Sequence, residues 1–78
     1  MVGYKKIYLD YYGLTTQDWI ACLGCGGTSI DIHHLIFKSQ GGKDVIENLA
    51  AVCRECHIKA HSDQIFNQSL IQKNNDIL

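Results

Sequence analysis

The stretch DIHHLIFKSQGGKDVIENLAAVCRECHIKAH, from Asp31 to His61, contains all four histidines of the 78-residue chain and two of its four cysteines. Imidazole and thiolate are common protein ligands of transition metals. This crowding raises the question of whether one metal ion or two explains it. The spacing within the stretch, together with the two cysteines that precede it, favours two ions.

The four cysteines form two C-x-x-C pairs, Cys22/Cys25 and Cys53/Cys56. Two such pairs are typical of a structural zinc site with four thiolate ligands, in which each pair chelates the ion from one turn. A chain of this size rarely gains more than about 3–5 kcal/mol from its hydrophobic core, so a metal staple is expected. The alternative, four reduced cysteines without a metal, would leave the core under-stabilised. We expect Trp19 and Ile20 to pack over the first pair.

The histidines belong to a different ion, because four thiolates already complete a tetrahedral site. His57 and His61 are four residues apart and therefore share one face of a helix, where they form a clamp for a second metal. His33 and His34 are neighbours on an expected strand, so their side chains diverge. One of these two can supply a third ligand while the other faces the cleft as an unliganded base. Three ligands with open positions are typical of a catalytic metal.

The pattern along the chain predicts a small α+β fold in one domain, residues 1–78, with the metal-binding motif at about 22–62. A first helix is expected at about 4–12. The elements expected after it are, in order, a strand at 28–37, a polar glycine-rich loop at 38–48, a strand at 49–53, and helices at about 54–62 and 63–74.

The composition limits the classes of function. Seven Lys and Arg residues stand against eight Asp and Glu, which gives a formal net charge of −1. Nucleic-acid-binding domains are usually basic, so strong non-specific affinity for DNA is not expected, although a small cationic cleft is compatible with this total. The N-terminus lacks the apolar region of a secretory signal, and no run approaches the roughly 18 apolar residues of a membrane span. We therefore expect a cytoplasmic protein without a membrane partner, in a compartment that keeps cysteines reduced.

These residues together resemble the HNH endonucleases, which are ββα-metal nucleases. The matching segments are DIHH, ENL, CRECH and the preceding CLGC, which lie between Cys22 and His61. The resemblance implies that His34 is the general base that activates water. It also implies a divalent-metal site formed by His33, His57 and His61, and it places Asn48 in the catalytic centre, where it fastens the loop between the strands and so orients the base. The whole chain is similar to small HNH proteins found near phage packaging genes.

The activity that this resemblance implies is metal-dependent cleavage of DNA by an endonuclease or nickase. The implied cofactors are a structural Zn²⁺ and a catalytic Mn²⁺, Mg²⁺, Ni²⁺ or Zn²⁺. Lys38, Lys43 and Arg54 surround the motif and are candidates for contacts with DNA phosphates. The implied partners are DNA and a phage packaging or other DNA-processing protein. The protein itself is expected to be a monomer or a homodimer in a bacterial host. The main alternative is a non-catalytic zinc-binding module that recruits DNA or a protein. A third possible function is that of a redox protein that uses its C-x-x-C pairs.

Overall fold

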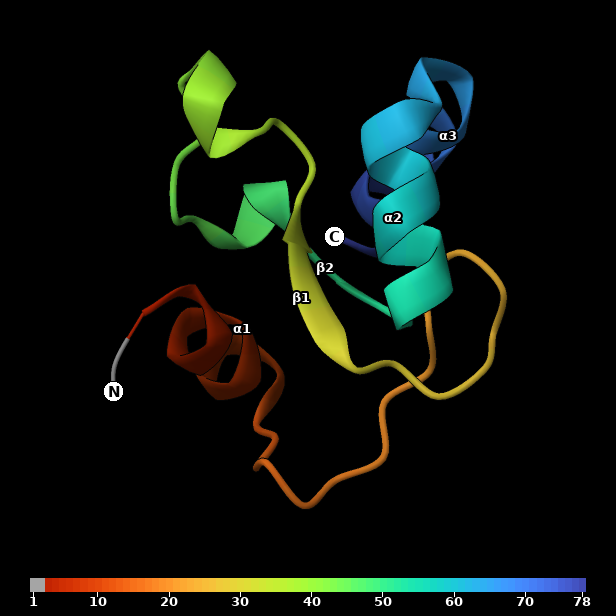
Figure 1. The fold of residues 1–78 in the computed structure, drawn as a ribbon. Helices are drawn as coiled ribbons and strands as arrows, with labels where there is room; N and C mark the ends of the chain where they lie inside the picture. Colours follow the sequence, from red (N-terminus) through yellow and green to blue (C-terminus); the bar gives the residue numbers. More distant parts are fainter. Residues whose placement is uncertain (1–2) are drawn as a thin grey trace.

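The structure, a computed structural model that describes residues 3–78, places a two-stranded sheet between helices (Figure 1). The elements in chain order are α1 (Tyr4–Tyr12), β1 (Asp31–His34), the 3₁₀ helices η1 (Lys38–Gln40) and η2 (Ile46–Asn48), β2 (Leu49–Val52), α2 (Arg54–Ser62) and α3 (Gln64–Ile77). In Figure 1, α1 lies on one side of the strands, and α2 and α3 lie on the other. The predicted small α+β fold with a ββα-metal motif, formed here by β1, β2 and α2, is confirmed.

The two strands pair antiparallel, with His33 opposite Ala50 and His34 opposite Leu49. All residues of β2 are buried, as expected for a short apolar run. An isolated two-stranded sheet is at best marginally stable in water, so it depends on the packing of α1 against both strands and of α2 against β1. Side chains alternate along a strand, so His33 and His34 point to opposite faces. His33 reaches Asn67 of α3, whereas His34 contacts Tyr4 of α1.

β1 is shorter than the strand expected at 28–37. Beyond its C-terminal end, the N–H of Ile36 donates to the side-chain Oδ1 of Asn48 at 2.7 Å, where a longer ladder would use a backbone carbonyl. Before its N-terminal end, Thr28 forms an isolated bridge with Ala21 and so belongs to the turn that carries the first cysteine pair. An asparagine side chain and a neighbouring turn therefore limit the strand.

The turn that carries the first cysteine pair is closed by backbone hydrogen bonds. Cys22 N–H donates to the carbonyl of Gly27 at 2.6 Å, and Gly26 N–H donates to the carbonyl of Cys22 at 2.9 Å. Gly26 has a φ of +81°, a left-handed conformation that favours glycine. The N–H of Leu23 donates to the carbonyl of Ala51 at 2.9 Å, which attaches the turn to β2.

The expectation that Trp19 packs over the first cysteine pair is wrong. Trp19 is 65% exposed, and its indole N–H donates to the hydroxyl of Thr28 at 3.0 Å. The place beside the cysteines is taken by Phe66 of α3, since a Cβ added to Gly24 would lie 3.0 Å from the Phe66 ring and 2.9 Å from the sulfur of Cys56. A residue more than forty positions later in the chain therefore fills this space.

The last helix extends from Gln64 to Ile77, beyond the end expected near residue 74. Asp63 caps its start, with Oδ1 accepting from the N–H groups of Ile65 and Phe66. The helix continues because Asn74 is buried and its side-chain amide donates to the carbonyl of Glu47 at 3.3 Å.

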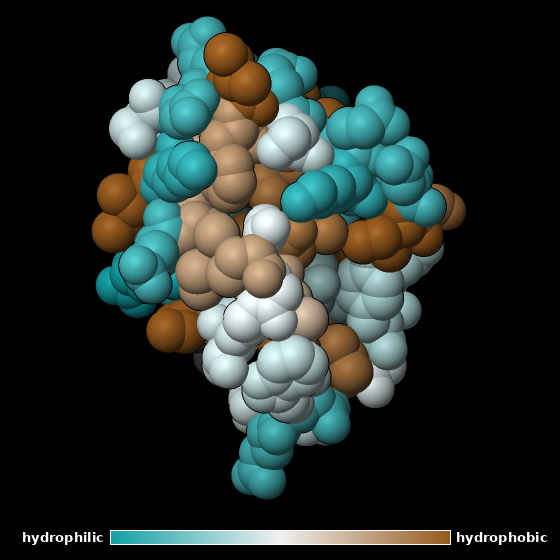
Figure 2. Space-filling view, turned by 90° about the vertical axis from the view of Figure 1, so that its right-hand side faces the viewer, coloured by the Kyte–Doolittle hydropathy of each residue, from teal (hydrophilic) through white to brown (hydrophobic). Residues whose placement is uncertain are grey.

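Seen from the side on which α2 and α3 lie, hydrophobic residues occupy the middle of the surface and hydrophilic residues follow much of its rim (Figure 2).

Within residues 3–78, no helix combines the length and the apolar composition that crossing a bilayer requires.

Candidate functional site

The four cysteine sulfurs gather where the first turn meets the start of α2. All four atoms lie within 4.8 Å of one another. The Sγ atoms of Cys25 and Cys53 are 3.8 Å apart. Zinc–sulfur bonds of about 2.3 Å in a tetrahedron place neighbouring sulfurs about 3.8 Å apart, so this separation fits a common zinc ion. A disulfide would need about 2.05 Å. The donor set and the spacing therefore fit the predicted four-thiolate site.

The backbone around the cysteines favours ionised sulfur. Burial raises the pKa of the Cys22 thiol, but hydrogen bonds from the backbone at Cys25, Cys53 and Gly24 outweigh it and lower this pKa to about 6. The sulfur of Cys53 accepts from the N–H of Cys56 at 3.4 Å, so Cys53 is also the N-cap of α2. Burial and the neighbouring thiols raise the pKa of Cys56. Because four thiolates repel one another, the full set needs a cation to ionise together.

Three histidines form a second cluster. Ligand nitrogens of His33, His57 and His61 lie within 4.8 Å of one another. Their ring centroids are separated by 5.0 to 5.4 Å. Imidazole nitrogens bound at about 2.1 Å to a tetrahedral ion lie about 3.4 Å apart, which is within the 4.8 Å limit of this cluster. The strand and the i, i+4 pair on α2 thus supply a possible three-nitrogen site from two elements.

One buried nitrogen of His33 is the strongest sign that the histidine cluster fits a metal ion. His33 is 1% exposed, and its Nδ1 is a buried side-chain nitrogen that has no hydrogen-bond partner in residues 3–78. An unpaired buried nitrogen costs about 1–3 kcal/mol, and ligation to a metal would remove that cost. Burial lowers the pKa of His33, and the nearby His57 and His61 lower it further. The lowered pKa favours the neutral ring, which is the form that binds a metal ion.

Asp31 orients His57 from the first residue of β1. Its Oδ2 accepts from Nδ1 of His57 at 2.9 Å, which leaves the lone pair of a neutral His57 on Nε2. Carboxylates of this kind commonly hold metal-binding histidines in position. Arg54 donates to the same carboxylate at 2.8 and 3.2 Å. Burial raises the pKa of Asp31, but the hydrogen bonds from His57 and Arg54 and the charge of Arg54 outweigh it, so that this pKa is lowered.

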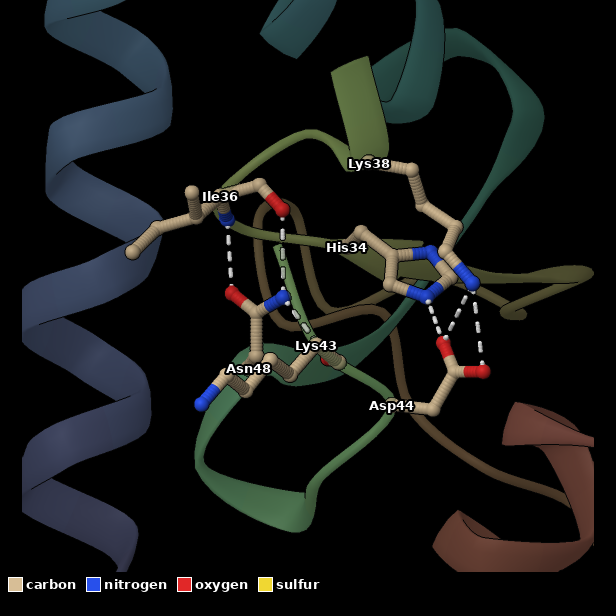
Figure 3. Close-up of polar contacts among 6 residues, drawn as sticks. All are labelled: His34, Ile36, Lys38, Lys43, Asp44 and Asn48. Carbon is tan, nitrogen blue, oxygen red and sulfur yellow. Dashed lines mark hydrogen bonds and ion pairs between the residues drawn. The ribbon is translucent and has the colours of Figure 1, made fainter. Parts of the chain in front are cut away.

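His34 lies beside the histidine cluster in a cleft of about 320 Å³. The cleft is lined by Tyr4, Ile32, His34, Phe37, Lys38, Ser39, His57 and His61. The His34 side chain is 12% exposed, and its Nε2 lies 2.7 Å from Oδ1 of Asp44 (Figure 3). Lys38 donates to both oxygens of this carboxylate at 3.2 Å. The hydrogen bonds from His34 and Lys38 lower the pKa of Asp44, and the charge of Lys38 lowers it further.

Asn48 is buried and braces the loop that follows β1. Its Oδ1 accepts from the N–H of Ile36 at 2.7 Å, and its Nδ2 donates to the carbonyls of Ile36 at 3.1 Å and Lys43 at 3.0 Å (Figure 3). One amide therefore joins the end of β1 to the segment that carries Asp44. In this way Asn48 fixes the distance between His34 and its carboxylate partner.

Gly42→Ala provides a test of this bracing. A Cβ at Gly42 would overlap the carbonyl group of Ile36, which is one of the groups that Asn48 holds. We expect a loss of about 2–3 kcal/mol in the free energy of unfolding, measured by urea denaturation. Gly27→Ala is the matched control, because its added Cβ meets the Cys25 sulfur at an ordinary 3.5 Å. Equal stability of the two variants would contradict the described loop.

The three basic residues predicted to meet DNA have different surroundings. Lys38 is paired with Asp44 at the cleft, and Arg54 is paired with Asp31 next to the histidine cluster. Both side chains are largely exposed. Lys43 uses its backbone carbonyl to accept from Asn48. Lys38 and Arg54 therefore border the site with part of their charge already neutralised.

Two side-chain contacts of the candidate site are not predicted by the sequence pattern. Asp44 stands ten residues after His34 in a polar loop, and Asn67 stands in the last helix. An acidic residue in the loop between the strands of a His-containing ββα motif was the only available signal for Asp44. No local pattern pointed to Asn67, because its partner is 34 residues away.

Comparison with known proteins adds an independent observation. A family model described as HNH endonuclease matches residues 22–63, which is more than half of the chain and includes all four cysteines and all four histidines. The chain belongs to the HNH endonuclease family. The resemblance noted in the sequence is confirmed.

This HNH protein is similar to one curated enzyme over part of its length. It is 38% identical over 39 residues to EcoKMcrA, a type IV methyl-directed restriction enzyme of Escherichia coli (strain K12). The match covers 50% of this chain but 14% of that enzyme, so the chain spans a small fraction of its relative. No solved structure shows a significant match. α1 and α3 lie outside the family match.

Proposed function

We propose that this HNH protein is a metal-dependent DNA endonuclease or nickase. Structural Zn²⁺ would be held by Cys22, Cys25, Cys53 and Cys56, and a catalytic divalent ion by His33, His57 and His61. The observation that carries the proposal is that His34 lines the same cleft as His57 and His61. When bound, the catalytic ion would stabilise negative charge on the scissile phosphate and on the leaving oxygen.

His34 supplies the base in this proposal, and the identity of the basic nitrogen follows from its contacts. A neutral imidazole carries one N–H and one lone pair. Nε2–H donates to the carboxylate of Asp44, so the lone pair is on Nδ1. Nδ1 is therefore the atom that takes a proton from the attacking water. A positioned general base contributes about 10²–10⁴-fold to a rate.

The ligand chemistry narrows the ions that support turnover. Three imidazoles suit Zn²⁺, Ni²⁺, Co²⁺ or Mn²⁺ better than Mg²⁺, which prefers oxygen ligands. We propose that Mn²⁺ or Ni²⁺ supports cleavage. A DNA substrate, a phage packaging or other DNA-processing partner, and a cytoplasmic location belong to the same proposal.

A non-catalytic zinc-binding module is the second candidate. The observation that favours it is electrostatic: the net charge is −1, and both Lys38 and Arg54 already have carboxylate partners. A module would hold zinc at the cysteines and recruit DNA or a protein without cleaving it. The two candidates differ in whether a second ion and metal-dependent nicking are present.

His57→Ala separates these candidates. We expect two metal ions per wild-type chain and one per His57→Ala chain after loading with Zn²⁺. The reason is that His57 belongs to the histidine cluster and not to the cysteine cluster. Metal content is measured by mass spectrometry, and nicking of supercoiled plasmid is measured in EDTA and then in Mn²⁺. Ile58→Ala, an exposed neighbour on the same helix, is the control and should keep both ions.

Wild-type protein that binds a single ion and leaves the plasmid intact in Mn²⁺ would support the module. Nicking that persists in EDTA would contradict a metal-dependent nuclease.

A further inference from the structure

One side chain of α3 links this helix to the histidine cluster. Asn67 lies beyond the residues that match the family. Its Oδ1 is 2.9 Å from Nε2 of His33, and its Nδ2 donates to the backbone carbonyl of Leu35 at 2.8 Å. The amide therefore bridges the buried histidine and the residue that follows β1.

The second of these bonds fixes which way the amide points. The carbonyl oxygen of Leu35 can only accept a hydrogen bond, so the NH₂ group of Asn67 must face it. Oδ1 must then face His33, and a carbonyl oxygen also only accepts. His33 must therefore present an N–H at Nε2.

The bond to Asn67 also defines the other ring nitrogen. A neutral imidazole has one N–H, so Nδ1 of His33 carries the lone pair. Nδ1 is the buried atom that lacks a hydrogen-bond partner. The same ring lies 5.0 Å from the His57 ring and 5.4 Å from the His61 ring, between centroids. The lone pair and the absent hydrogen-bond partner thus coincide on one ring nitrogen of His33.

We propose that Asn67 is a positioning residue that fixes His33 in the Nε2–H tautomer and so keeps the Nδ1 lone pair available to a metal ion. This inference rests on the proposed metal site and extends that site to a helix outside the family match. Without Asn67, Nε2–H would be buried without its acceptor, and the ring would also populate the tautomer that carries its proton on Nδ1. In that tautomer Nδ1 has no lone pair to offer a metal ion. Removing such partners typically weakens metal affinity about 10–100-fold.

Three variants test the proposal in the full chain. Asn67→Ala removes both hydrogen bonds, whereas Asn67→Asp keeps an acceptor for Nε2–H. Asn74→Ala is the matched control, because Asn74 is a buried asparagine on the same helix that donates to the carbonyl of Glu47. It controls for the loss of stability that follows from deleting a buried amide.

Two measurements are made with zinc retained at the cysteines. Long-range ¹H–¹⁵N NMR before addition of the second metal, at about pH 8, where an imidazole is neutral, reports the tautomer of His33. Titration calorimetry with Ni²⁺ then reports the affinity of the histidine site. We expect a single Nε2–H tautomer in the wild type, in Asn67→Asp and in Asn74→Ala. Asn67→Ala should show mixed tautomers and bind Ni²⁺ about 10–100-fold more weakly.

The outcomes separate this inference from the proposed function. A single Nε2–H tautomer and wild-type Ni²⁺ affinity in Asn67→Ala would overturn the role of Asn67. Equal weakening in Asn74→Ala would overturn it too, because the effect would then be one of stability. Wild-type protein that binds no Ni²⁺ at the histidines would refute the proposed metal site, while the tautomer of the two Asn67 variants would still decide what Asn67 does to His33.

Discussion

His34→Ala is expected to lower the rate of plasmid nicking in Mn²⁺ by about 10²–10⁴-fold, the usual contribution of a general base. The side chain borders the cleft and is not part of either metal cluster. Its Nε2 is held by Asp44, and its ring packs edge-on against Tyr4 with centroids 4.5 Å apart. Substitution therefore removes the base while it leaves the metal ligands in place.

The measurement combines nicking rates with metal content and thermal unfolding. The His34→Ala protein should keep both ions. Its melting temperature should fall by about 4–8 °C for each kcal/mol of packing energy that the substitution removes. Gln72→Ala, an exposed residue of α3 purified in the same way, controls for contaminating nucleases. Nicking at the wild-type rate by His34→Ala, with Gln72→Ala equally active, would remove His34 from the catalytic centre.

The metal clusters were predictable because their spacing is set by local geometry. C-x-x-C pairs chelate from one turn wherever that turn lies, and His57 and His61 share a helix face whatever the helix packs against. The alternation of a strand likewise separates His33 from His34. The structure brings His33 to the other two histidines, and it leaves His34 in the adjoining cleft.

The remaining contacts depend on tertiary structure. Asp44 meets His34 across ten residues of a loop without periodicity, and Asn67 meets His33 from a helix that no motif includes. Trp19 is near the cysteines in sequence, yet Phe66 from α3 fills the space beside them. Side chains that pack across long sequence separations leave no signal in the spacing of residues.

The pairing of the basic residues also has a consequence for DNA binding. Lys38 and Arg54 each neutralise a carboxylate that holds a histidine. Part of their positive charge is therefore already paired within the site and is less available to DNA phosphates. A phosphate entering the cleft would compete with Asp44 for Lys38. The net charge of −1 therefore predicts weak binding of DNA by this segment alone, and a partner or a second copy would be needed for tight binding.

Cys53→Ser is expected to release zinc and unfold the protein, which is the largest effect on stability that the structure predicts. Binding of structural zinc contributes about 10–16 kcal/mol in zinc-finger peptides, and it is coupled to folding. Total stability of small proteins is about 5–15 kcal/mol, so loss of the ion exceeds what the remaining contacts can offset. The cysteines Cys22 and Cys56 also belong to the buried core, which joins the metal to the packing around it.

Serine is the informative substitution because it separates the two roles of Cys53. The thiol accepts from the N–H of Cys56 as the N-cap of α2, and serine is itself a favourable N-cap. The variant therefore keeps the cap and loses the thiolate. Asp63→Ala is the control, since it removes the cap of α3 and should cost about 1 kcal/mol while it keeps zinc. Zinc content and circular-dichroism melting measure both. If Cys53→Ser melts like Asp63→Ala and retains its ion, the four sulfurs are not what holds this fold together.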